Sequence, residues 1–136
     1  MVDITMPRIQ EVLLPYLRDN LPGVQVVSWV PDIPQRQFPL LNIRRLGGLP
    51  KHPRLLDRAV IEMTCYGDVD LASTENIFLD ARTLVWDLFD KQIVTPKGTI
   101  SSYFETMGPS QFDSPFEDTW RVQSLTQLGM RPPRNS

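Results

Sequence analysis

The sequence predicts an α/β protein of the α+β type, with a mostly antiparallel five-stranded sheet packed against two main helices. Apolar residues recur at helical spacing in residues 5–21 and 71–90. Five other segments are rich in β-branched residues or alternate apolar with polar side chains, as strands do. Their order is helix, three strands, helix, two strands, which favours helices layered on one sheet.

The first helix is predicted over residues 5–21 and ends at Pro22-Gly23. Its apolar residues at helical spacing are Ile9, Val12, Leu13, Tyr16 and Leu17. Pro15 removes one backbone hydrogen bond, so we expect it to kink or split the helix.

Three strands are predicted next, over residues 24–30, 40–46 and 58–66. Residues 47–57 are expected to form a loop that joins the second and third strands into a hairpin. The third strand alternates cleanly. Its expected inward residues are Ala59, Ile61, Met63 and Cys65, and its expected outward residues are Val60, Glu62, Thr64 and Tyr66.

The second helix, residues 71–90, carries the strongest pattern, a broad apolar face of Ile77, Phe78, Ala81, Leu84, Val85 and Leu88. Asp68 and Asp70 precede it and are expected to cap the helix rather than to bind a divalent cation. Residues 99–106 and 119–128 form the last two strands. Residues 1–128 are expected to form a single domain and residues 129–136 a flexible tail.

Composition narrows the class of protein. Hydrophobic residues make up 41% of the 136 residues and charged residues 22%, as in globular domains rather than disordered chains. The net charge of −2 predicts no general attraction to nucleic acid or to an anionic membrane. We expect no signal peptide and no membrane span, and therefore synthesis in the cytoplasm. The lone Cys65 cannot form an internal disulfide, which suits a reducing compartment.

No catalytic, metal-binding or cofactor-binding motif is found in the sequence, so we expect neither an enzyme nor a cofactor. The lone histidine, His52, lies in a proline-bracketed segment and is expected to be an exposed loop residue. Cys65 falls on the inward side of a strand, where a thiol behaves as a small hydrophobe. One Cys and one His do not supply the ligands of a zinc site.

Charge is divided unevenly along the chain. The segment 44–58 has one acid, Asp57, against the five cations Arg44, Arg45, Lys51, Arg54 and Arg58. The segment 68–90 has one cation, Arg82, against six acids, Asp68, Asp70, Glu75, Asp80, Asp87 and Asp90. Three interpretations stay open: two solvated faces, head-to-tail self-association through complementary surfaces, or contact of the basic segment with nucleic acid.

Leu79 and Trp86 lie seven residues apart, so they share one side of the second helix, about 160° from its apolar face. A tryptophan on an acidic helix face favours a contact site for a subunit or partner. The alternative is a second layer of the same domain that covers this side.

Two runs of residues carry a pattern that extends to later segments of the chain. The first is a strand ending in basic residues and Gly-Gly, Phe38-Pro39-Leu40-Leu41-Asn42-Ile43-Arg44-Arg45-Leu46-Gly47-Gly48. The second is the strand Leu56-Asp57-Arg58-Ala59-Val60-Ile61-Glu62-Met63-Thr64-Cys65-Tyr66-Gly67. The helix with Ala81-Arg82 and the strand with Trp120-Arg121-Val122-Gln123 follow in the same order. Over roughly residues 22–128 the chain therefore resembles tail terminator proteins of long-tailed (siphovirus-type) actinobacterial phages.

The resemblance implies a virion structural protein that forms a hexameric ring at the head-proximal end of the tail tube. Its implied partners are copies of itself, the tail tube protein and the head-completion protein of the neck. Two alternatives remain, a tail-completion or head-closure protein and a small nucleic-acid-binding accessory protein that uses residues 44–58.

Overall fold

The structure, a computed structural model, describes residues 6–52 and 55–133, with the backbone alone for residues 49–52. Its elements confirm the predicted fold class. In chain order they are α1 (Ile9–Asn20), β1 (Gln25–Val27), the short 3-10 helix η1 (Ile33–Gln35), β2 (Leu40–His52), β3 (Leu56–Gly67), α2 (Leu71–Asp90), β4 (Thr99–Phe112) and β5 (Trp120–Arg131).

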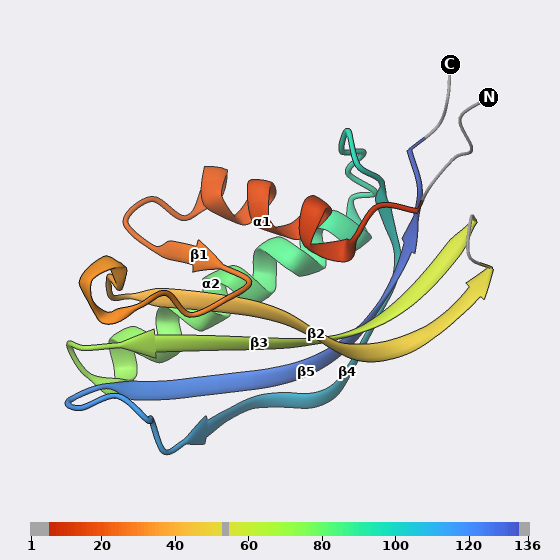
Figure 1. Cartoon of the computed structure of the whole chain (residues 1–136). Helices are drawn as coiled ribbons and strands as arrows, with labels where there is room; N and C mark the ends of the chain where they lie inside the picture. The colour runs from red at the N-terminus through yellow and green to blue at the C-terminus, as the bar shows by residue number, and fades with distance from the viewer. Residues whose placement is uncertain (1–5, 53–54, 134–136) are drawn as a thin grey trace.

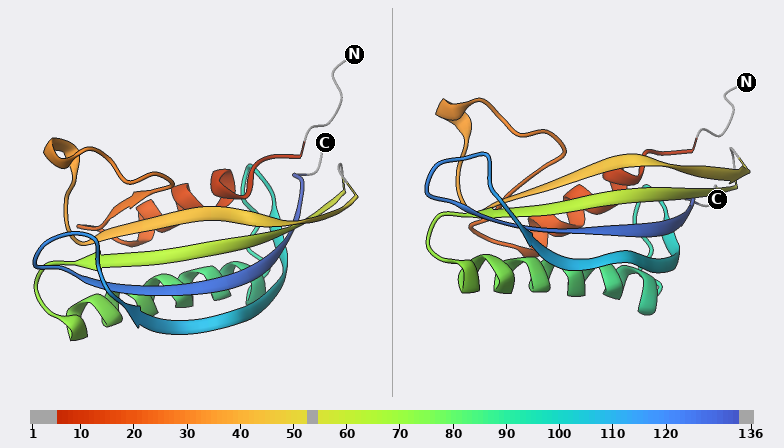
Figure 2. Two further views of the ribbon diagram at one scale, coloured as in Figure 1. Left: turned by 60° about the horizontal axis from the view of Figure 1, so that its bottom comes forward. Right: turned by 90° about the horizontal axis from the view of Figure 1, so that it is seen from below.

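The five strands form one mixed sheet in the order β1-β2-β3-β5-β4 (Figure 1). β1 is parallel to β2, and the other neighbouring pairs are antiparallel. Both helices pack on one face of the sheet, because residues of α1 and α2 share one core cluster with the inward side chains of the strands. Figure 2 shows the opposite side, where the strands lie in front of α1. We call this side the open face.

The hairpin of β2 and β3 confirms the predicted pairing, but the loop predicted over residues 47–57 is wrong. The ladder continues from Leu40 opposite Tyr66 to His52 opposite Leu56. A register shift between Arg45 and Gly47 interrupts it, and Gly48 follows at φ 121°. A side chain at Gly48 would collide with the Arg58 carbonyl, so the glycine permits the two strands to stay paired through this irregularity.

The last hairpin is also longer than predicted. β4 reaches Phe112 rather than residue 106, and its ladder to β5 has three register shifts. β5 ends at Arg131, and Met130 is fully buried. The predicted end of the last strand at residue 128 is therefore wrong, since the next three residues continue the strand and Met130 joins the core.

The first helix begins later than predicted and is not split. Residues 6–8 precede it, and the Glu11 carboxylate accepts a hydrogen bond from the Arg8 amide at 2.8 Å. Pro15 lies inside the helix, which continues to Asn20. The residues that α1 buries are Ile9, Val12, Leu13 and Leu17. Burial of this apolar face outweighs the lost backbone hydrogen bond at Pro15.

The alternation of β3 is confirmed, because Ala59, Ile61, Met63 and Cys65 all lie in the core beneath the helices. The capping role of Asp70 is confirmed as well, since its carboxylate accepts a hydrogen bond from the Ser73 amide at 2.7 Å. The residues that α2 buries are Thr74, Phe78, Ala81, Val85 and Leu88. Two predicted members of its apolar face, Ile77 and Leu84, lie half-buried at the margin of the core.

Candidate interaction surfaces

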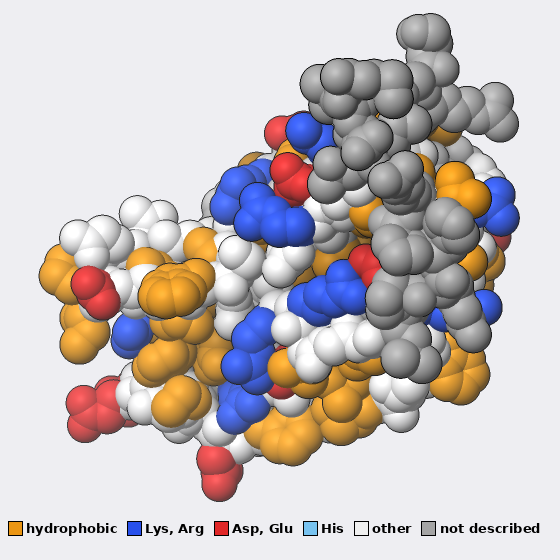
Figure 3. Space-filling model, turned by 45° about the vertical axis from the view of Figure 1, so that its right-hand side comes forward, with side chains coloured by type: hydrophobic (Ala, Val, Ile, Leu, Met, Phe, Trp, Pro, Cys, Tyr) orange, Lys and Arg blue, Asp and Glu red, His pale blue; other side chains and the backbone are white. Residues whose placement is uncertain are grey.

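The basic segment of the sequence becomes one long hairpin, which we call the basic hairpin (β2 and β3 with their connecting turn). Arg44 lies opposite Glu62 in the ladder, out of phase with the inward pair Ile43 and Met63. Arg44 therefore projects from the open face, and Arg58 has the same phase as Glu62. Figure 3 brings the hairpin end forward and shows Lys and Arg side chains in a band across this side.

The structure gives two of the five predicted cations acidic partners within the chain. Arg45 donates to Asp57 through both terminal nitrogens, at 2.5 and 2.9 Å, and Asp57 is only 8% exposed. Arg44 lies 3.2 Å from Glu62, but its own side chain is 57% exposed. The side chain of Lys51 and the whole of Arg54 lie outside the described residues. Arg45 is thus part of the folded hairpin, whereas Arg44 remains accessible to a partner.

Leu79 and Trp86 lie together on the outer side of α2, each 41% exposed. The Trp86 ring makes edge contacts with Tyr103 of β4, at a centroid distance of 5.0 Å, and with Phe89, at 5.3 Å. Trp86 lies about 120° from the middle of the buried stripe that α2 actually uses, rather than opposite to it. It therefore flanks β4 and is half covered by the chain's own residues.

Next to Trp86, a charged network joins α2 to β4. The Arg82 guanidinium donates to both carboxylate oxygens of Glu105 at 2.7 Å, and the Tyr103 hydroxyl donates to Glu105 at 2.9 Å. The hydrogen bonds from Arg82 lower the pKa of Glu105, and burial raises the pKa of Tyr103 to about 12. Glu105 is therefore ionised and satisfied within this network. A pocket of about 360 Å³ opens here, lined by Arg82, Thr83, Trp86, Tyr103 and Glu105.

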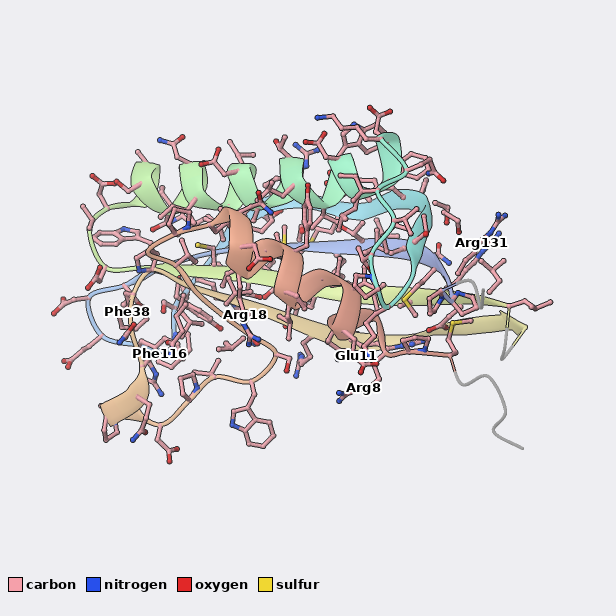
Figure 4. All side chains as sticks on the ribbon, turned by 90° about the horizontal axis from the view of Figure 1, so that it is seen from above. Arg8, Glu11, Arg18, Phe38, Phe116 and Arg131 are labelled. Carbon is pink, nitrogen blue, oxygen red and sulfur yellow. The ribbon has the colours of Figure 1, made fainter. Side chains whose placement is uncertain are left out.

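At the far end of the sheet, aromatic residues fasten two loops together. Phe116 lies 4.8 Å from Tyr66 and 6.1 Å from Phe38, measured between ring centroids. Figure 4 shows Phe38 and Phe116 side by side. The Arg36 guanidinium lies 4.1 Å above the Phe116 ring, so the loops before β2 and before β5 are held as one unit.

A groove of about 650 Å³ runs between α1 and the turn after α2. Figure 4 shows three of its charged residues, Arg8 just before α1 and Glu11 and Arg18 within α1. The apolar part of its lining is Val12, Leu14, Pro15, Tyr16, Ile93, Val94 and Pro96. Its charged residues are of both signs, so its electrostatics select neither a cationic nor an anionic ligand.

Of the two residues weighed for catalysis, Cys65 and His52, the structure describes the side chain of Cys65 alone. Cys65 is fully buried, which confirms that it is a core residue, and burial raises the pKa of its thiol to about 12. The His52 side chain falls outside the described part of the chain. Within residues 6–52 and 55–133 no three potential ligands gather for a metal ion. None of the helices described is long and apolar enough to cross a membrane.

The sequence does not indicate that Tyr103 and Glu105 are parts of the pocket beside Trp86. Three register shifts break the period-2 pattern along β4, so the sequence alone does not show which of its residues face α2. Arg82 offered a weak signal, because it is the lone cation among the acids of α2.

Comparison with known proteins agrees with the resemblance seen in the sequence. A family model described as phage tail termination protein matches residues 5–136. Two similar proteins, both named Gene 22 protein, come from Mycobacterium phages D29 and L5. Each is 44% identical over 135 residues, which cover 96% of this chain and 97% of the relative. The chain therefore belongs to the phage tail termination protein family and resembles proteins of phages that infect actinobacteria.

Proposed function

We propose that the protein forms a homo-oligomeric ring, a hexamer, that caps the head-proximal end of the phage tail tube and joins the tail to the head. Membership of the family makes it a phage tail protein, and thus a component of the virion. The ring, its six copies and its place in the neck follow from the resemblance of the sequence. We propose that it acts through its surfaces alone, without catalysis or a cofactor.

The observation that carries this proposal is the position of the two charged surfaces. The basic hairpin extends past the end of β1, on the flank of the sheet formed by β2 (Figure 1). The acidic side of α2 packs next to β4, at the opposite edge. A head-to-tail ring requires two different, complementary surfaces on separate sides of each copy. The separation of these two surfaces supports the proposal.

Light scattering of the purified protein, with and without the tail tube protein, tests the proposal. We expect a closed oligomer, alone or on contact with tube ends, and electron microscopy should show it at one end of each tube. Phage lacking the protein should assemble tubes of uncontrolled length. A protein that stays monomeric in both mixtures and leaves tube length unchanged would contradict the proposal.

The same experiments separate the two alternatives. A tail-completion or head-closure protein would bind the head connector and leave tube length unaffected. A nucleic-acid-binding protein would retard DNA in a gel in a salt-dependent way, since phosphate contacts release counterions. The ion pair of Arg45 with Asp57 weakens the second alternative, because that guanidinium group is already occupied by a carboxylate of the same hairpin.

A further inference from the structure

We propose that the pocket beside Trp86 binds a guanidinium group from the basic hairpin of a second copy of this chain. This inference rests on the proposed ring and specifies one of its contacts. The arginine would stack on the indole ring of Trp86, between the acidic side chains of α2. The pocket, the aromatic platform and the surrounding charge each support this assignment.

The pocket is rigid before any partner arrives. The Arg82–Glu105 pair that lines it is held by two hydrogen bonds of 2.7 Å. The Trp86 ring also lines it and packs at steep angles against Tyr103, at 88°, and Phe89, at 66°. The indole remains 41% exposed, so part of the ring is open to a stacking partner. A preorganised site of this kind loses little conformational entropy on binding.

The exposed acids on this side of α2 favour a cation as the ligand. Arg82 cannot repel a second guanidinium strongly, because Glu105 neutralises it. Glu75 and Asp90 are exposed and stand on the same side of α2 as Leu79 and Trp86. Asp80 and Asp87 are the next acids around the helix, and Lys91 lies 3.5 Å from Asp87. The indole face attracts cations as well, and arginine is the usual partner of tryptophan in such contacts.

The chain itself supplies a matching ligand. Its basic hairpin carries five cations against the two acids Asp57 and Glu62. Arg44 and Arg58 have the same phase in the ladder and lie on the open face, Arg44 in the first half of β2 and Arg58 near the start of β3. Because the hairpin and the pocket occupy different flanks, one copy cannot satisfy both surfaces by itself. A second copy in a head-to-tail arrangement can.

The test measures oligomer mass against protein concentration for two substitutions of one residue. Trp86→Phe keeps an aromatic ring, whereas Trp86→Leu keeps only apolar volume. We expect Trp86→Leu to raise the concentration at half-assembly about 2- to 5-fold for each contact, and Trp86→Phe to raise it less. Equal assembly by the two variants at every concentration would refute the stacking contact.

A second pair of substitutions avoids the packing of Trp86 altogether. Glu75 and Asp90 are exposed, so Glu75→Gln with Asp90→Asn should leave the thermal midpoint unchanged and weaken assembly most at low salt. Replacement of Arg44 and Arg58 by Gln should weaken it similarly. When combined with Trp86→Leu, the arginine replacements should add little further loss, because they remove the same contact.

The outcomes distinguish this inference from the proposed ring. If the parent protein forms rings and all these variants assemble as it does, the ring stands and the Trp86 contact is wrong. If losses from the arginine and Trp86 substitutions simply add, the two groups do not meet. If the parent stays monomeric even with tube protein, the proposed function fails first.

Discussion

The ion pair between Arg45 and Asp57 predicts that one of the arginines expected at an interface instead stabilises the fold. Replacement of Arg45 by Gln keeps a polar side chain but removes the charge. The Asp57 carboxyl group, at 8% exposure, then lies in a mostly dry site without the two hydrogen bonds from the guanidinium. Arg44→Gln removes a charge from the adjacent position, where the side chain is 57% exposed.

The two substitutions should differ clearly in magnitude. Breaking a fully buried ion pair costs about 3–5 kcal/mol, because one charge is left uncompensated. Arg45 is 30% exposed, so water reaches part of the site and we expect a loss of about 2 kcal/mol for Arg45→Gln. An exposed pair such as that of Arg44 is worth about 0.2–1 kcal/mol, so Arg44→Gln should cost under about 0.5 kcal/mol.

Urea unfolding of the monomeric protein, followed by circular dichroism, measures both losses. Asp57→Asn completes a double-mutant cycle with Arg45→Gln, and the coupling energy should account for most of the single-mutant loss. Equal stabilities of Arg44→Gln and Arg45→Gln would show that Asp57 does not depend on Arg45. In that case, replacement of Arg45 by an acidic residue would test assembly without disturbing the fold. We expect instead that such a replacement destabilises the fold.

Three further predictions concern the core and its ionisable groups. Ile61→Ala removes three carbons from a packed interior and should cost about 2–4 kcal/mol in urea unfolding, whereas Val60→Ala, on the open face of the same strand, should cost under about 1 kcal/mol. The folded-state pKa of Glu105 is lowered from 4.5, so its contribution to stability is present above that value and is lost as pH falls through the lowered pKa. Glu105→Gln should therefore reduce the loss of stability at acid pH, as measured in a pH series of unfolding midpoints. The Cys65 thiol, with a pKa of about 12, should resist a thiol reagent at pH 8 in the folded protein and react fully in denaturant; rapid native labelling would contradict its burial.

The elements that the sequence predicted best are those whose side chains repeat without interruption. The apolar spacing and the Asp70 cap both predict a helix over residues 71–90, and α2 has these bounds. The inward set of β3 followed from strict alternation. Both signals are local, so tertiary contacts had little to override.

The errors came where local composition and long-range pairing disagree. Gly47-Gly48 and Pro50 predict a turn, yet the register of β2 against β3 continues through them because the ladder accommodates an irregularity there. Arg45 looked like the other cations of its segment, and only the fold places it on the helix side of the sheet next to Asp57. The sequence pattern puts Trp86 opposite the core, because that pattern includes Ile77 and Leu84 in the apolar face. The stripe that α2 actually buries leaves both out and lies nearer to β4.

The pair Tyr66-Gly67 has a consequence for how the two faces of the sheet are connected. Tyr66 packs against Phe116 on the open face, where it fastens the loop before β5. The next residue, Gly67, has no side chain, and a Cβ there would overlap the Thr74 hydroxyl, which itself donates to the Asp70 carbonyl at 2.8 Å. Successive residues of one strand thus determine how closely α2 sits on one side and where the loop sits on the other. The seating of α2 and the position of the loop before β5 therefore depend on the same peptide unit of β3.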